Sequence, residues 1–542
     1  MNFILGVNLV FCLSALWSST MVGEQLSKPS FQDSPRIKEM NFSDIVNVIM
    51  KINRPLVKVN ALRGIIIGDY QVHPNTICSA GHRSCLWPPS EDNNIYIPYA
   101  FQSNYKRAQR ALIIAALSEF ESLTCIRFKY RSREVTYLAF IDGVGCWSYV
   151  GPGTKTAQEI SLQIPYCMDV GIIQHQLMHA LGFYHESSRS DRDDHVEVKM
   201  ENVEKGSEIN FKIKKSNNLV TKYDYNSVLH FGRYAFSKSP GLPTIVPKLD
   251  PNVYLGQLMG LSETDILKIN KLYECKTCGN LLTENYGYFT SPNFPNFYPD
   301  HANCKWMIRA PWHHKIVLEF DFFHIQPFLG CYRDNLKIYD GSTTRSPVLK
   351  GPVCGKMAPA VISTHHLLLI VFSSGHHKHS KGFSAKYRFV KCGRMLITSP
   401  TKIIGRFEHS GSINPNESSN CFWLVQAHKG HEVVFEITTY NFQTSDNCTF
   451  AYLKIHDVSQ APPASQGKFC GATPVPLTEG TALLLEFNHP GAQMQPGLRV
   501  DYKCVIRPFE RQGRSSVRWN AQCDAFMLSC LSVSPDYRDP FY

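Results

Sequence analysis

The sequence lacks a long hydrophobic run beyond its first residues. Residues 1–23 are apolar and end in small residues, which predicts a secretory signal, although no lysine or arginine precedes the apolar core. An uncleaved anchor is the alternative for this stretch. After residue 23 no run approaches 18 apolar residues, so we expect no membrane span in the mature chain and a secreted, extracellular protein.

The chain also lacks a cysteine-rich zinc finger or any other nucleic-acid recognition motif. Its formal net charge of +11 therefore does not predict a nucleic-acid partner. What it has instead is 18 cysteines in 542 residues, which favour an oxidising compartment and a framework of disulfides. This length accommodates three or four domains, each with its own core.

Three histidines in the segment HQLMHALGFYHE, residues 175–186, have the spacing of metal ligands. His175 and His179 lie four positions apart, so a helix presents both imidazoles on one face, one turn apart. Gly182 lets the chain turn out of the helix and bring His185 to the same metal, with a fourth position left for water. We predict one Zn²⁺ ion here, and a vestigial helix without metal is the alternative.

Together with YDYNSVLHFGRYAFS at residues 223–237, this motif resembles the astacin family of metzincin zinc endopeptidases, in its hatching-enzyme branch. In that family a glutamate after the first histidine acts as general base. A later SxMHY segment supplies a methionine turn and a tyrosine near the metal. This chain has Gln176, Leu229 and Phe231 at those three positions.

The three departures have unequal chemical weight. Gln176 has no usable basicity near neutral pH, and general acid–base catalysis contributes about 10²–10⁴-fold to a rate. Phe231 lacks the hydroxyl that the resemblance assigns to oxyanion stabilisation, and losing one such donor costs about 10²–10³-fold. Leu229 is a near-isosteric apolar replacement. These residues favour an inactive or weakly active peptidase homologue, and they leave the question of enzymatic activity open.

The resemblance implies a propeptide over residues 24–77. Gly68-Asp69 matches the pair whose aspartate plugs the zinc until the propeptide is cut away. No lysine or arginine lies between Asp69 and Cys78, so the usual trypsin-like activation point is absent. Glu186 matches the glutamate that meets the freed N-terminus in the family, and in an unprocessed chain we expect it to lack that partner.

The predicted protease domain covers residues 78–275. Residues 107–120 have helical periodicity, and residues 161–167 are strand-like, so we expect the latter to form the sheet edge beside a bound peptide. The resemblance implies three disulfides in this domain, the last of them typical of the hatching-enzyme branch: Cys125–Cys275, Cys146–Cys167 and Cys78–Cys85.

The remaining chain is an internal repeat of two units that resemble CUB domains. The sequence LKIYD at residues 336–340 is answered by LKIHD at residues 453–457, and four cysteines recur at matching intervals. Alternating apolar runs such as KIVLEF, HLLLIVF and ALLLEF predict short, half-buried strands of antiparallel sandwiches. The disulfides expected in the two units are Cys278–Cys304, Cys331–Cys354, Cys392–Cys421 and Cys448–Cys470, which leave Cys504, Cys523 and Cys530 unpaired.

Many CUB domains bind calcium through three acidic residues, and this chain lacks most of them. The residues at the corresponding positions are Gln326, Asp334 and Gly375 in the first unit and Gln443, Ala451 and Pro490 in the second. Of these six residues, Asp334 alone is acidic. A hard cation needs more oxygen ligands than these. We therefore expect no calcium in either unit.

The predicted fold class is multidomain: an α+β metzincin-type protease domain followed by two all-β CUB sandwiches. The predicted ranges are 1–23 (signal), 24–77 (propeptide), 78–275 (protease domain), 278–391 (first CUB), 392–504 (second CUB) and 505–542 (tail). We expect a non-catalytic homologue that binds an extracellular or egg-coat glycoprotein through its cleft and CUB domains. The alternatives are an active zinc endopeptidase of hatching-enzyme type that cleaves extracellular proteins, and a purely structural matrix component.

Overall fold

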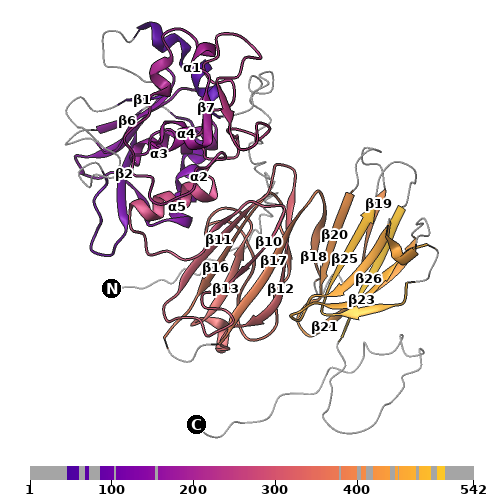
Figure 1. Ribbon diagram of the computed structural model, residues 1–542. Helices are drawn as coiled ribbons and strands as arrows, with labels where there is room; N and C mark the ends of the chain where they lie inside the picture. The colour runs from indigo at the N-terminus through magenta and orange to yellow at the C-terminus, as the bar shows by residue number, and fades with distance from the viewer. Residues whose placement is uncertain are drawn as a thin grey trace, which may run out of the picture.

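The structure is a computed structural model with three folded units in succession (Figure 1). It describes residues 45–59, 68–71, 86–102, 105–152, 157–376, 380–398, 404–410, 419–439, 446–449, 451–471, 475–489 and 497–506. The predicted signal, most of the predicted tail, the Cys78–Cys85 pair, Gln443 and Pro490 lie outside these residues. None of the described helices is long and apolar enough to cross a membrane.

The first unit, here called the N-terminal domain, is built on a six-stranded sheet. The strand order is β1-β5-β6-β4-β2-β3, with bounds Tyr70–Gln71, Cys146–Tyr149, Ala157–Leu162, Tyr137–Ile141, Ile95–Phe101 and Ile126–Tyr130. A small ribbon joins β7 (Val196–Val198) to β8 (Ile245–Pro247). The α-helices are α1 (Ile45–Val59), α2 (Arg107–Leu123), α3 (Val170–Ala180), α4 (Arg192–His195) and α5 (Glu263–Leu272).

The edge of this sheet differs from our expectation. Residues 161–167 were predicted to form it, but β6 (Ala157–Leu162) lies inside the sheet between β4 and β5. In the sheet, β5 lies beside β6 on the side of the predicted propeptide. The propeptide strand β1 pairs in parallel with β5, with Tyr70 opposite Ser148. A strand-like sequence does not reveal its neighbours, because pairing partners are chosen by the whole sheet.

Each of the other two units is a sandwich of two sheets. The first sandwich has the orders β10-β17-β12-β15 and β14-β13-β16-β11-β9. Its strands are β9 (Leu281–Leu282), β10 (Tyr286–Thr290), β11 (Asn303–Arg309), β12 (Lys315–His324), β13 (Asn335–Tyr339), β14 (Val348–Val353), β15 (Val361–Ile362), β16 (Leu367–Ser373) and β17 (Gly382–Val390).

The second sandwich repeats this plan with the orders β18-β20-β25-β22-β23 and β19-β26-β21-β24. Its strands are β18 (Cys392–Ile397), β19 (Ile404–Ser410), β20 (Ser419–Gln426), β21 (His431–Thr439), β22 (Tyr452–Asp457), β23 (Ala464–Phe469), β24 (Thr478–Gly480), β25 (Ala482–His489) and β26 (Gly497–Ile506).

Disulfide bonds cross-link each of the three units. The pairs formed within the described residues are Cys125–Cys275, Cys146–Cys167, Cys278–Cys304, Cys331–Cys354, Cys392–Cys421 and Cys448–Cys470. These are the expected partners. Cys504 is buried and forms no disulfide with a described residue. The bridge between Cys125 and Cys275 closes the longest loop, and in the chain-entropy model such a loop stabilises the fold by several kcal/mol.

The expectation of half-buried strands is wrong for the most apolar ones. In β16, Leu368 and Ile370 point into the first sandwich, whereas Leu369 and Val371 belong to the core of the N-terminal domain. In β25, likewise, alternate residues contact the second sandwich and the first. A strand covered on both faces carries a continuous apolar run, so LLLIVF and ALLLEF are apolar at almost every position because a second unit covers their outer face.

Candidate metal centre

The helix that carries the first two histidines has a defined start and end. Asp169 precedes α3, and its carboxylate accepts hydrogen bonds from the backbone N–H groups of Gly171 and Ile172, which a helix leaves unpaired. At the other end, Trp87 donates its indole N–H to the carbonyl of Ala180. Gly182 then adopts a φ of 99°, which favours glycine and turns the chain out of the helix.

Four side chains converge beyond this helix: Asp69, His175, His179 and His185. One ligand atom of each lies within 4.8 Å of all the others, and all four residues are buried. The Asp69 carboxylate is 2.6 Å from His175 Nε2 and 3.0 Å from His185 Nε2. The aspartate of the predicted propeptide therefore lies at the centre of the three predicted ligands.

The outer ring nitrogens orient the imidazoles. His175 Nδ1 lies 2.8 Å from the carbonyl oxygen of Val228, and His179 Nδ1 lies 2.8 Å from that of Phe183. A carbonyl only accepts, so each Nδ1 carries a proton and each Nε2 faces the centre. Such hydrogen bonds to a carbonyl are what holds metal-binding histidines in the correct tautomer.

Burial favours the neutral form of two of the three histidines. Burial lowers the pKa of His179 to about 4, and it also lowers the pKa of His185. Burial alone would raise the pKa of Asp69, but the neighbouring His185 and His175 hold it well below its usual range. A neutral imidazole, favoured by burial for His179 and His185, is the form of histidine that binds a metal cation.

The residues that differ from the family pattern lie around this centre. Gln176 is fully buried on α3; its amide N–H group lies 3.3 Å from the carbonyl of Cys146, and its Oε1 has no hydrogen-bond partner among the described residues. The Phe231 ring is fully buried and its centroid lies 4.5 Å from that of His185. Leu229 is buried in the same core as α3.

The segment that carries Leu229 and Phe231 is tied to α5. The buried Asp265 carboxylate accepts hydrogen bonds from Ser227 Oγ at 2.6 Å and from the backbone N–H of Val228 at 2.8 Å. The carbonyl of Val228 in turn accepts the His175 imidazole. The sequence motif indicated that this segment lies near the metal, but nothing in it indicated Asp265 as its anchor.

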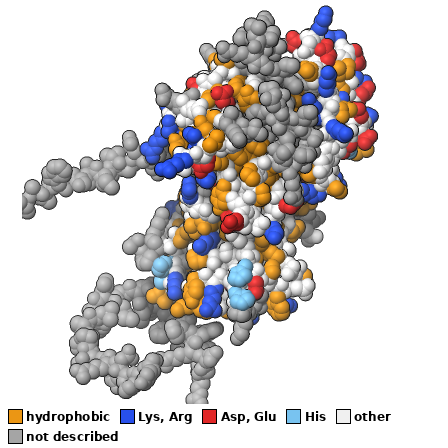
Figure 2. Space-filling view, turned by 90° about the vertical axis from the view of Figure 1, so that its left-hand side faces the viewer, with side chains coloured by type: hydrophobic (Ala, Val, Ile, Leu, Met, Phe, Trp, Pro, Cys, Tyr) orange, Lys and Arg blue, Asp and Glu red, His pale blue; other side chains and the backbone are white. Residues whose placement is uncertain are grey.

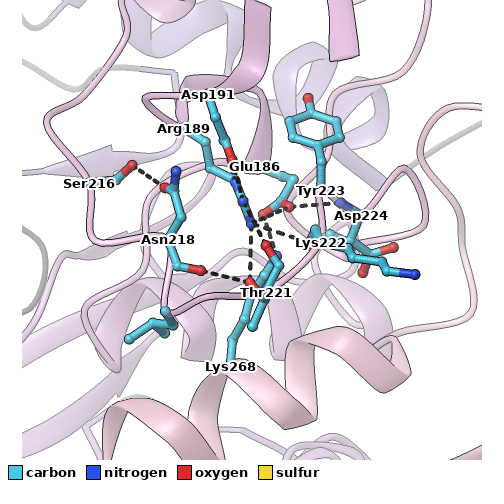
Figure 3. A network of polar contacts seen from close by, with 12 residues as sticks. Glu186, Arg189, Asp191, Ser216, Asn218, Thr221, Lys222, Tyr223, Asp224 and Lys268 are labelled. Atoms are coloured by element: carbon cyan, nitrogen blue, oxygen red, sulfur yellow. Dashed lines mark hydrogen bonds and ion pairs between the residues drawn. The ribbon is translucent and has the colours of Figure 1, made fainter. Parts of the chain in front are cut away.

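Glu186, directly after the third histidine, has partners that we did not foresee. Its carboxylate accepts from Lys268 Nζ at 2.5 Å, from the backbone N–H of Asp224 at 2.9 Å and from Arg189 at 3.3 Å (Figure 3). All three charged side chains are buried. Lys268 comes from α5, 82 residues further along, and no motif marks it. A small cavity of about 60 Å³ borders this cluster and His185.

His230 supplies a pH dependence of stability. It is buried, its Nδ1 lies 2.6 Å from the Phe231 carbonyl, and its Nε2 accepts the Tyr223 hydroxyl at 2.8 Å. Burial lowers the pKa of His230 to about 4, whereas an unfolded histidine titrates near 6.5. Because the unfolded chain then binds the proton first, stability falls as the pH decreases from about 6.5 towards 4.

We expect this single group to contribute a loss of about 2–3 kcal/mol over that window. Thermal unfolding followed between pH 7 and 4 should therefore show a shallower decline for His230→Gln than for the wild-type protein. Parallel pH profiles for the two proteins would contradict this assignment.

A buried three-histidine centre in an α+β domain, followed by two disulfide-bonded sandwiches, defines the class: a metallopeptidase-type domain with two CUB domains. The profile of the Astacin peptidase family matches residues 84–274, and the CUB domain profile matches residues 278–387 and 392–502.

Proteins of similar sequence align with most of this chain. Embryonic protein UVS.2 of Xenopus laevis is 37% identical over 87% of this chain and 88% of that protein. The Astacin-like metalloendopeptidase of Coturnix japonica is 39% identical over 69% of this chain and 90% of that protein. The chain therefore belongs to the astacin family, which confirms the resemblance and the predicted fold class.

One solved structure extends the comparison. High choriolytic enzyme 1, a hatching enzyme zinc-protease from Oryzias latipes, is 43% identical and aligns with 36% of this chain and 96% of that one, with a TM-score of 0.35. Tolloid-like protein 1 of Homo sapiens is also related, at 34% identity over 71% of this chain and 38% of that protein.

Proposed function

We propose that this protein is a secreted, zinc-binding astacin homologue with little or no peptidase activity, which binds extracellular glycoproteins such as those of an egg coat. The observation that carries the proposal is a complete set of metal ligands beside an amide where a general base is needed. Secretion is supported by the apolar residues 1–23 and by the disulfide framework.

The geometry of the centre suits zinc. His175 Nε2 and His179 Nε2 lie 3.1 Å apart, close to the roughly 3.3 Å that separates two nitrogen ligands of a tetrahedral zinc. Two nitrogens this close need a proton or a metal cation between them, and a zinc ion bound to both would supply it. Asp69 Oδ1 and His185 Nε2 are buried and face each other at 3.0 Å without forming a hydrogen bond, which a shared cation would remedy.

The residues around the centre do not supply proton transfer. Zinc, when bound, polarises a water molecule for attack on a peptide carbonyl. Gln176 can accept a hydrogen bond from such a water through Oε1, but its amide cannot take the proton or pass it to the leaving nitrogen. The Phe231 ring offers no donor to a developing oxyanion. The centre therefore holds ligands without advancing their hydrolysis.

The predicted propeptide is built into the domain. Ile45, Val48 and Ile49 of α1 are buried in the core that also contains α3. Asn53 bonds to both the N–H and the C=O of Cys146, at 2.8 and 2.9 Å. With no lysine or arginine between Asp69 and Cys78, these contacts support a propeptide that stays in place.

We assign the binding of other proteins to the CUB domains and, in a chain from which the propeptide strand β1 has been removed, to the edge of β5 that β1 covers. The outer face of β10 exposes Tyr286 and Tyr288, and Phe297 is exposed nearby in sequence. Exposed aromatic residues are enriched in protein interfaces. Figure 2 shows that hydrophobic side chains on one face of the molecule lie in a broken band among charged groups.

We further propose that the CUB domains do not need calcium. Asp334, the one acidic residue at the expected site, is buried and already accepts hydrogen bonds from Tyr298 at 2.6 Å and from the N–H of Gly375 at 2.8 Å. These donors take the place of a cation at the carboxylate. Among the described residues, the cluster of Asp69 and the three histidines is the one group of three or more His, Cys, Asp or Glu side chains close enough together to hold a metal ion.

Metal analysis of the purified full chain tests both metal assignments. We expect about one zinc ion per chain, no calcium, and a melting temperature that does not change when calcium is added. The His179→Ala variant should lose the zinc, whereas His230→Gln, which alters a buried histidine outside the centre, should keep it. A wild-type protein without zinc would favour a structural component instead, and chelator-sensitive cleavage of casein or an egg-coat protein would favour the active endopeptidase.

A further inference from the structure

Arg309 belongs to the first CUB domain, but its side chain is buried against the N-terminal domain. It is the last residue of β11 and is 5% exposed. In this strand Trp306 and Ile308 point into the CUB core, so the alternation places Met307 and Arg309 on the opposite face. Met307 accordingly belongs to the core of the N-terminal domain.

The guanidinium of Arg309 meets two groups of the N-terminal domain. Its Nη2 donates to the backbone carbonyl of Leu261, and its Nη1 lies 3.5 Å from Glu119 Oε2. Glu119 is a buried residue of α2. In Figure 1 the upper end of the first sandwich lies against α2 and α5.

The same two residues, Glu119 and Leu261, hold the residue that precedes the first metal ligand. Gln174 donates its amide to Glu119 Oε2 at 2.8 Å and accepts the backbone N–H of Leu261 at 3.0 Å. Gln174 is fully buried, and it is followed directly by His175. Gly260, at a φ of 99°, lies so close to the Gln174 amide that a Cβ would collide with it.

Because this cluster is buried, we expect the loss of the Arg309 side chain to disturb the residues that it contacts. An ion pair out of water is stable only when both charges are compensated, and removing one partner leaves an uncompensated charge. Arg309 is the basic side chain that pairs with Glu119 in the described chain. Without it, Glu119 would keep only an amide donor and would draw Gln174 out of position or take up water.

We infer that the first CUB domain is a positioning element of the metal centre, in which Arg309 fixes Gln174 through Glu119 and Leu261 and so holds the start of the histidine helix. Leu369 and Val371 of the same sheet belong to the apolar core that also contains Leu177 of this helix, and strands β11 and β9 pack against α2 and α5. The expected effect of Arg309 on metal affinity rests on the proposed zinc site, whereas its expected effect on the order of the histidine helix does not.

The test compares Arg309→Met with Arg388→Met in the full chain. Arg388 is a matched control, because it bonds to Glu319 at 2.8 Å and lies over the Phe422 ring at the junction of the two CUB domains, away from the metal centre. Mutation of a residue that bonds directly to a metal ligand typically changes metal affinity about 10–100-fold, and Arg309, which acts through Glu119 and Gln174, should lie at the lower end of that range. We expect Arg309→Met to weaken zinc binding about 10-fold in a chelator competition, and Arg388→Met to leave it unchanged.

Amide hydrogen exchange in residues 170–180 provides a second readout that needs no metal. Exchange there should accelerate in Arg309→Met and not in Arg388→Met. If Arg309→Met fails to fold, Arg309→Met with Glu119→Gln leaves no buried charge unpaired and serves in its place. Unchanged exchange in a folded Arg309 variant would overturn the inference; a wild-type chain without zinc but with the exchange difference would overturn only the proposed zinc site.

Discussion

Gln176→Glu combined with Phe231→Tyr is expected to turn this protein into a zinc-dependent endopeptidase. The glutamate would supply the base that Gln176 lacks, worth about 10²–10⁴-fold, and the tyrosine an oxyanion donor worth about 10²–10³-fold. The two gains need not multiply, because groups that act in one step are not additive. Cleavage at least about 10²-fold above the wild-type rate is the expected result.

The experiment requires an open centre, because the Asp69 carboxylate lies between the three histidines. A protease site introduced between Asp69 and Cys78 allows residues up to 77 to be removed from wild-type and variant proteins alike. Gln176→Met, which also changes the residue but supplies no base, is the control. Zinc content should stay the same in all three. Wild-type protein that cleaves casein as fast as the double variant would refute the assignment of Gln176 as the lost base.

Lys268→Met is expected to have the largest effect on stability. The Glu186 carboxylate would keep Arg189 at 3.3 Å but lose its closest partner. Breaking a buried ion pair from one side costs about 3–5 kcal/mol, because the remaining charge stays buried. Lys271→Met is the matched control. Lys271 lies on the same helix, but its ammonium is exposed, and its partners among the described residues are the carbonyls of Leu219 and Val220.

Urea or thermal unfolding measures the difference. Lys271→Met should change stability by no more than about 0.5 kcal/mol, as exposed substitutions usually do. Adding Glu186→Gln to Lys268→Met should restore part of the loss, since no unpaired carboxylate then remains. Equal stabilities of the two lysine variants would show that Glu186 does not depend on Lys268.

The local parts of the site were predictable from the sequence. The spacing of His175 and His179 follows from the period of a helix, and Gly182 marks its end, so the ligand set needs no knowledge of the rest of the fold. The repeated cysteines and the LKIYD and LKIHD segments likewise revealed two related β units, which the CUB match confirms. The zinc and the loss of catalysis stay predictions.

The long-range parts were not predictable. The pairing of Lys268 with Glu186, the position of β5 beside the propeptide strand and the contact of Arg309 with Glu119 each join residues that are distant in sequence and carry no motif. Because the charged groups are buried, losing one partner of a pair is costly, but only the packing of whole elements decides which charges become buried together.

The sequence by itself determined the chemistry that this protein has available: three imidazoles at metal spacing, an amide in place of a base, and an aspartate upstream. These follow from residue types and from the geometry of one helix. The tertiary structure decided how the chemistry is held, because burial and pairing are properties of the packed chain. It places the Asp69 carboxylate at the histidines, and it packs the first CUB domain against the core that holds the metal helix.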